Sequence, residues 1–69
     1  MTVNGKPVAY EPITLLDYLQ QAGFNPSHVV VERNNASVGA SEIITRERFG
    51  EVTLRQDDEI NILRFMGGG

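Results

Sequence analysis

The chain is 69 residues long, which is enough for one domain with a small core. Its six basic and nine acidic residues give a net charge of −3, which disfavours nucleic acid as a partner and favours a protein with a basic docking face. The absence of cysteine excludes disulfides and thiolate metal sites. No apolar run approaches the roughly 18 residues of a membrane span, and no leader pattern opens the sequence, so we expect a cytoplasmic protein with no membrane partner.

The first third of the chain predicts a hairpin followed by a helix. Residues 2–10 form two short stretches around Asn4-Gly5, a dipeptide typical of tight β-hairpin turns. Residues 12–23 have helical periodicity, with Thr14 as the N-cap and Gly23 as a left-handed C-cap. The apolar stripe of this helix is expected to consist of Leu15, Leu16, Leu19 and either Gln20 or Ala22.

The rest of the chain predicts strands separated by short irregular elements. Residues 28–34 are rich in β-branched side chains and predict a strand that is buried on at least one face. The pattern then predicts a loop over 35–41, a short strand over 42–44, one helical turn over 45–49 and a short apolar element over 52–54. Asp57 and Asp58 are expected to form the turn before a last strand over 59–66, and most of the acidic residues to solvate the surface.

This order of elements indicates an α+β protein. One main helix has to cover one face of a mixed sheet of about four to five strands, because no other segment can bury that face. If the first and last strands are neighbours, they are expected to be parallel, since the helix supplies the crossover between them. The arrangement is the β-grasp, or ubiquitin-like, fold. We expect it to occupy residues 1–66 and to be followed by a flexible glycine tail over residues 67–69.

The most distinctive pattern is the run Gly67, Gly68 and Gly69, directly after the last predicted strand. Glycine has no side chain, so such a tail can enter a narrow channel in a partner protein. The five residues from Phe65 to Gly69 reach roughly 17 Å when they are extended. We interpret Gly69 as the residue whose carboxylate reacts, and Gly67 and Gly68 as the residues that give it access. An incidental, unstructured end is the alternative interpretation.

The three residues before the glycines are candidates for docking to a partner. Phe65 and Met66 point to opposite faces of the predicted strand, so one of them is exposed and either anchors a partner or packs at the strand end. Arg64 either pairs with an acidic group of the partner or is only solvated. His28 has no cysteine or acid pair near it in the sequence, which favours a surface histidine over a metal ligand or general base.

Several stretches together resemble the ThiS family of sulfur carriers in thiamine biosynthesis, which belongs with the MoaD carriers to one ubiquitin-like family. The resemblance spans the whole chain, and its most specific part is the triple glycine at the end of a final β-grasp strand. The stretches that carry it are the Asn4-Gly5-Lys6 hairpin, Leu15-Leu16, and residues 29–34, 42–44, 46–49, 60–62 and 65–69.

The resemblance implies a carrier that is not itself an enzyme. A ThiF-like adenylyltransferase would activate Gly69 with ATP and Mg²⁺, a sulfur-donating enzyme would supply sulfur, and sulfur would replace one carboxylate oxygen. The resulting thiocarboxylate would donate sulfur to a ThiG-like thiazole synthase. No cofactor or metal is expected on the chain itself, which also lacks a Ser-His-Asp set, paired catalytic carboxylates and a phosphate-binding loop.

Two departures from the family pattern and several alternatives stay open at this point. Residues 35–41 look like an insertion of about half a dozen residues in a turn, which loop-closure entropy makes inexpensive. Asp57 stands where these carriers often have glycine. The alternatives are the small subunit of molybdopterin synthase, a sulfur carrier of another pathway, a ubiquitin-like modifier of lysines and a plain interaction module.

Overall fold

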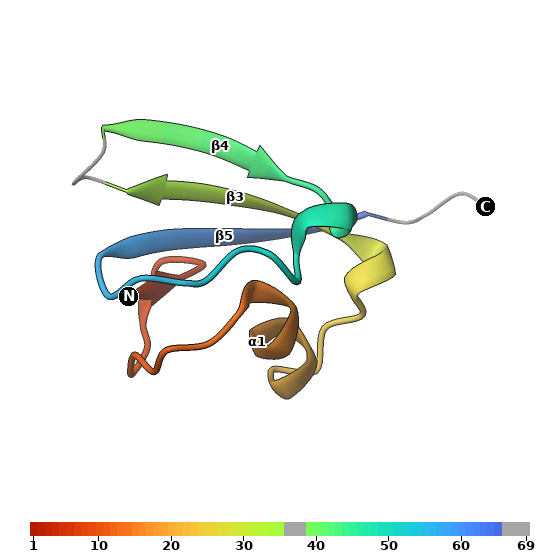
Figure 1. Ribbon diagram of the computed structural model, residues 1–69, viewed down its shortest axis with the longest axis horizontal. Helices are drawn as coiled ribbons and strands as arrows, with labels where there is room; N and C mark the ends of the chain where they lie inside the picture. The colour runs from red at the N-terminus through yellow and green to blue at the C-terminus, as the bar shows by residue number, and fades with distance from the viewer. Residues whose placement is uncertain (36–38, 66–69) are drawn as a thin grey trace.

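The computed structural model describes residues 1–35 and 39–65, in which one α-helix packs on a five-stranded mixed sheet. The sheet order is β2-β1-β5-β3-β4, and Figure 1 shows α1 against one face of the sheet. Strand β1 pairs antiparallel with β2 and parallel with β5, whereas β3 is antiparallel to both β5 and β4. The predicted β-grasp fold is therefore confirmed. The elements are β1 Thr2–Val3, β2 Lys6–Pro7, α1 Leu15–Gln21, η1 Pro26–His28, β3 Val29–Asn35, β4 Ala40–Ile44, η2 Arg46–Arg48 and β5 Asp58–Arg64.

The hairpin turn between β1 and β2 is built by two residues with positive φ. Asn4 has φ 52° and Gly5 has φ 81°, as a turn that matches the twist of the strands requires. Asn4 also contacts β5: its backbone N–H donates to the Ile60 carbonyl oxygen at 2.8 Å, and its Oδ1 accepts from the Ile62 N–H at 2.8 Å. Two hydrogen bonds thus link the β1–β2 turn to β5, the central strand of the sheet.

Helix α1 begins where the capping pattern predicts. The hydroxyl of Thr14 accepts from the Asp17 N–H at 3.2 Å, and Gly23 has φ 85° just after the helix. Leu15 and Leu19 are fully buried. Leu16 packs against the core, as predicted. The prediction that Gln20 or Ala22 continues the apolar stripe is wrong, because both are exposed, and Tyr18 and Phe24 pack against the core instead.

The core lies between α1, the inner face of the sheet and the segment that leads from η2 to β5. This segment forms no strand over residues 52–54, apart from one bridge between Thr53 and Thr14. Its backbone covers the start of α1: the Leu15 N–H donates to the Val52 carbonyl oxygen at 2.8 Å, which satisfies a helix-end donor. The buried apolar residues are Val3, Leu15, Leu19, Val29, Val31, Ile44, Phe49, Val52, Leu54, Ile60 and Ile62.

The connection between β3 and β4 is shorter than the predicted loop of residues 35–41. Strand β3 extends to Asn35 and β4 begins at Ala40, and both of these residues pair with each other. The reason lies far away in the sequence: the amide of Asn35 is buried and donates to the carboxylate of Asp58. Residues 36–38 of the predicted loop lie outside the described residues.

Three boundaries of the strands predicted over 28–34 and 59–66 also shift. His28 belongs to η1 and precedes β3, and β5 begins at Asp58, one residue earlier than predicted. Asp58 is 1% exposed, so it is neither a surface residue nor only a turn residue. Strand β5 ends at Arg64, whereas the last strand was predicted to reach Met66, which lies outside the described residues.

Candidate functional site

The candidate site begins where β5 ends. Strand β5 is the central strand of the sheet, between β1 and β3, and its last residue, Arg64, is opposite Val29 of β3. Phe65 follows, and its N–H donates to the His28 carbonyl oxygen at 3.1 Å. The backbone is therefore held in place up to the last described residue. The predicted reactive residue Gly69, with Gly67, Gly68 and Met66, lies outside the described residues.

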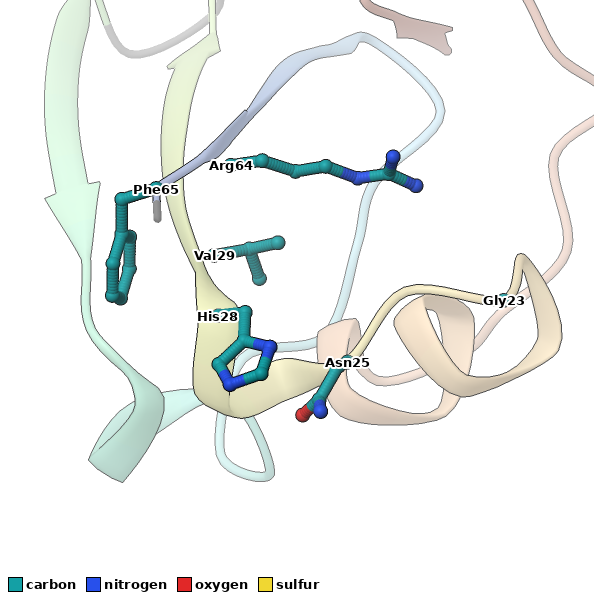
Figure 2. A pocket seen from close by; sticks show the side chains of 6 residues that line it. All are labelled: Gly23, Asn25, His28, Val29, Arg64 and Phe65. Atoms are coloured by element: carbon teal, nitrogen blue, oxygen red, sulfur yellow. The ribbon is translucent and has the colours of Figure 1, made fainter. Parts of the chain in front are cut away.

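Phe65 forms a ridge between two hollows in the surface. It is 46% exposed, which confirms that an apolar side chain near the end of the strand faces solvent. One hollow, of about 380 Å³, lies toward the helix side, and in Figure 2 the side chains of Arg64 and Phe65 leave the strand in different directions. Its lining consists of Gly23, Asn25, His28, Val29, Arg64 and Phe65. The other hollow, of about 370 Å³, is formed by η1, η2 and the start of β3.

Arg64 makes a contact that neither sequence interpretation included. Its guanidinium carbon lies 4.8 Å from the centroid of the Phe24 ring, a cation–π arrangement that orients the side chain. Within residues 1–35 and 39–65, no ion pair of Arg64 is found. Phe24 lies just after the C-terminal end of α1, far from Arg64 in the sequence. No motif in the sequence links these two residues. His28 is exposed and lines the hollow of about 380 Å³, as predicted for a surface histidine.

Polar contacts on the other side of Phe65 involve η2. Arg46 donates from Nη1 to the Ser27 hydroxyl oxygen at 3.3 Å, which links η2 to η1. The backbone N–H of Glu47, the Thr45 hydroxyl and the charge of Arg46 lower the pKa of the exposed Glu47 carboxyl below its usual 4.5. Glu47 is therefore an anion at neutral pH, so this hollow carries charges of both signs.

Two further exposed apolar side chains were missed by the sequence analysis. Ile43 of β4 is 54% exposed and Leu63 of β5 is 53% exposed, both on the sheet face that α1 does not cover. The alternation of buried and exposed residues in β5 was visible in the sequence. The sequence analysis predicted one helix over one face, but only the structure shows which of the two alternating rows of β5 side chains that helix covers.

Residues 1–35 and 39–65 contain neither a cluster of metal-ligating side chains nor a membrane-spanning helix. Within it, no group of three or more histidine, cysteine, aspartate or glutamate residues is placed to hold a metal ion. No helix among those residues is long and apolar enough to cross a membrane.

Comparison with known proteins identifies the family. The sequence profile of the ThiS family matches residues 1–69. The chain belongs to the ThiS family. The sulfur carrier protein ThiS of Bacillus subtilis (strain 168) is 38% identical to this ThiS-family chain over 71 positions, which cover 100% of the chain and 98% of that protein.

A second relative is a longer protein. A thiazole synthase of Magnetococcus marinus is 40% identical over 68 residues, which cover 97% of this ThiS-family chain. The chain spans only 19% of the length of that thiazole synthase.

Solved structures agree with the family. The crystal structure of the thiamine biosynthesis protein ThiS of Geobacter metallireducens matches with a TM-score of 0.73 and 35% identity, over 99% of this chain and 96% of that one. An NMR solution structure of a thiamine biosynthesis protein from the same organism matches with a TM-score of 0.69 and 33% identity, over 99% and 85% of the two chains.

Proposed function

We propose that this ThiS-family chain is a sulfur carrier of thiamine biosynthesis and that Gly69 carries the sulfur. The observation that supports the role most strongly is the similarity to the B. subtilis sulfur carrier along almost the full length of both proteins. The position of the glycines in the sequence supports the site. They come shortly after the central strand β5, and Phe65, the residue that follows this strand, donates a backbone hydrogen bond to the His28 carbonyl oxygen.

The proposed chemistry answers a specific difficulty. A terminal carboxylate is an anion at neutral pH and a poor electrophile. In the first step, a carboxylate oxygen of Gly69 attacks the α-phosphorus of ATP in the adenylyltransferase, which forms an acyl adenylate and releases pyrophosphate. Sulfide (HS⁻) delivered by the sulfur-donating enzyme then attacks the carbonyl carbon, the bond from that carbon to the AMP oxygen breaks with its electron pair leaving on AMP, and the thioacid loses its proton to give the thiocarboxylate. Mg²⁺ and hydrogen-bond donors of the partner stabilise the developing charge.

The proposed acceptor of the sulfur is a thiazole synthase. The support is that a protein named thiazole synthase in Magnetococcus marinus contains a stretch 40% identical to this chain within one polypeptide. Fusion of two activities in one chain keeps them at a high effective concentration, which is useful when one delivers a group to the other.

The residues next to the glycines have proposed roles in docking. The exposed ring of Phe65 is a suitable anchor for a partner, because aromatic side chains that fill a pocket contribute strongly to binding. Arg64 is held over Phe24 and would present its charge to an acidic group of the partner. Met66 and the glycines would continue from there into the active site of the partner.

Deletion of Gly69 tests the site. We expect the shortened chain to unfold at the same urea concentration as the intact one, because the buried core lies between Val3 and Ile62. We expect it to lose ATP–pyrophosphate exchange with the adenylyltransferase, since the reactive carbonyl is withdrawn by one residue. Gln20→Ala, at an exposed helix position, is the control and should exchange normally. Exchange by the deletion variant at the rate of the control would show that Gly69 is not the activated residue.

A further inference from the structure

The turn between β1 and β2 brings together the two groups that an asparagine needs in order to modify itself. Asn4 and Gly5 are both exposed, and within residues 1–35 and 39–65 the backbone N–H of Gly5 has no hydrogen-bond partner. The backbone nitrogen that follows an asparagine can attack its side-chain carbon Cγ, and glycine hinders this attack least because it has no side chain. The dipeptide is therefore a reactive site as well as a turn.

The reaction at this site needs only water. The Gly5 nitrogen loses its proton to solvent and forms a bond to Cγ of Asn4, the bond from Cγ to Nδ2 breaks, and Nδ2 takes up a proton and leaves as ammonia. The product is a five-membered cyclic imide. Water then adds to one of the two carbonyl carbons of the imide, and the bond from that carbon to the nitrogen breaks. Opening at Cγ gives aspartate, whereas opening at the backbone carbonyl carbon gives isoaspartate, in which the main chain runs through Cβ and Cγ.

The folded turn opposes the first step of this reaction. The φ values of Asn4 and Gly5, 52° and 81°, match a type I′ turn, which has about 60° and 90°. In such a turn, Cβ of the first residue lies nearly trans to the nitrogen of the second, so Cγ is turned away from the nucleophile. The Asn4 Oδ1 also accepts from the Ile62 N–H at 2.8 Å, which holds the side chain against β5. The imide therefore forms only when the turn leaves β5.

The turn belongs to the part of the sheet with the fewest contacts to lose. Strands β1 and β2 have two residues each, and β2 is an edge strand with both residues exposed. Val3 is the one buried residue of these two strands. Regions with few buried apolar contacts open locally at a smaller cost than global unfolding. Opening of this hairpin would expose Asn4 to the reaction while the rest of the domain stays folded.

The two products differ in what they do to β5. Aspartate at position 4 keeps a side-chain oxygen for the Ile62 N–H and tolerates a positive φ. Isoaspartate adds one carbon to the main chain between the paired residues Val3 and Lys6, so the two-residue turn no longer fits. It also removes the acceptor of the Ile62 N–H from its place. Because β5 leads to the glycines, this product weakens the strand that precedes them.

We propose that Asn4 is a site of spontaneous conversion to isoaspartate, that its attachment to β5 holds this conversion back, and that the conversion releases β5 near Ile62. The other described asparagines provide internal controls. Asn25 precedes Pro26, whose nitrogen carries no hydrogen, and Asn61 precedes a β-branched residue that hinders attack.

The first test follows the intact chain over time at one temperature and mildly alkaline pH, in buffer and in urea. Peptide mass spectrometry detects the exchange of an amine for a hydroxyl at each asparagine, and enzymatic methylation detects isoaspartate. We expect conversion at Asn4 to be about tenfold or more slower in buffer than in urea, because only the open fraction reacts. Equal rates in buffer and urea, or conversion in urea that is no faster at Asn4 than at Asn25 and Asn61, would overturn the proposal.

A second test distinguishes opening of the turn from global unfolding. Val3→Ala and Val52→Ala remove the same two methyl groups from buried valines, the first in β1 and the second in the segment that leads to β5. Conversion is compared at temperatures where both variants have the same free energy of unfolding, with rates divided by those in urea. We expect Val3→Ala to convert Asn4 at least about threefold faster, because it loosens the hairpin itself. Equal ratios would show that the attachment of the turn does not control the reaction.

The last test measures the effect on β5. The isoaspartyl chain is separated by chromatography, and hydrogen exchange of its Ile62 amide is compared with that of Asn4→Asp, which represents the other product. We expect the isoaspartyl chain to lose protection at Ile62 by about tenfold or more relative to Asn4→Asp. Equal protection in the two chains would overturn the release of β5.

Discussion

The carboxylate of Asp58 is buried at the start of β5, where an ion pair and two hydrogen bonds balance its charge. Its Oδ2 lies 3.0 Å from Nη2 of Arg33 and accepts from the Arg55 N–H at 2.8 Å, while Oδ1 accepts from the Asn35 amide. A buried charge is tolerated only when it is paired and hydrogen-bonded. This one residue therefore joins β3, β5 and the turn that precedes β5.

At the residue scale, Asp58→Asn should destabilise the domain strongly. The substitution leaves the side chain of Arg33, which is 16% exposed, without its buried partner. We expect the free energy of unfolding to fall by about 3 kcal/mol in urea titrations, as when one partner of a buried ion pair is removed. Glu59→Gln, at the next and exposed position, is the matched control and should change stability by less than about 0.5 kcal/mol. Similar losses in the two variants would show that the buried pair is not a main determinant of stability.

At the scale of elements, β5 depends on the hairpin that precedes it by more than fifty residues. Strand β1 has only two residues, and Asn4 continues the attachment beyond it through its backbone N–H and its side-chain oxygen. Asn4 also adopts a left-handed conformation that few residues other than glycine and asparagine accept. The turn is therefore as much a support for β5 as a connection between β1 and β2.

Asn4→Ala should loosen β5 locally. It removes the acceptor of the Ile62 N–H and places alanine at positive φ, so we expect a loss of about 2 kcal/mol in unfolding free energy. Hydrogen exchange by NMR provides a local measurement, in which the Ile62 amide should lose protection. Asn61→Ala changes the same residue type on the sheet face that α1 does not cover, and it should leave that amide protected. An Ile62 amide that exchanges equally slowly in both variants would contradict the role of Asn4.

The elements also show which parts of the fold could be predicted from sequence. The Asn4-Gly5 turn, the Thr14 cap and the β-branched run of β3 were predicted correctly, because each depends on neighbouring residues. The end of β3 and the starts of β4 and β5 were not, because they lie at the contact between Asn35 and Asp58, which are 23 residues apart. Residues 35–41 were predicted to be a loop because the sequence does not show that Asn35 is buried and donates to Asp58.

At the scale of the whole molecule, a backbone hydrogen bond holds the chain at Phe65, just before the tail, and the sheet face beside Phe65 is not covered by α1. The exposure of Phe65 follows from the alternation of side chains along a strand, which predicted that either Phe65 or Met66 is exposed. The contact of Arg64 with Phe24 and the exposure of Ile43 and Leu63 were not, because they depend on how α1 and β4 are placed relative to β5. The assignment of sulfur to Gly69 rests on the sequence and the family, and it stays a prediction.

The most direct test of the account is the intact mass of the chain after incubation with ATP, Mg²⁺, the adenylyltransferase and a sulfur donor. We predict that the mass rises by the difference between sulfur and oxygen, that fragmentation places the change at Gly69, and that thiazole synthase with its substrates reverses it. A chain that is adenylated but never gains this mass, or that gains it at a residue other than Gly69, would contradict the account.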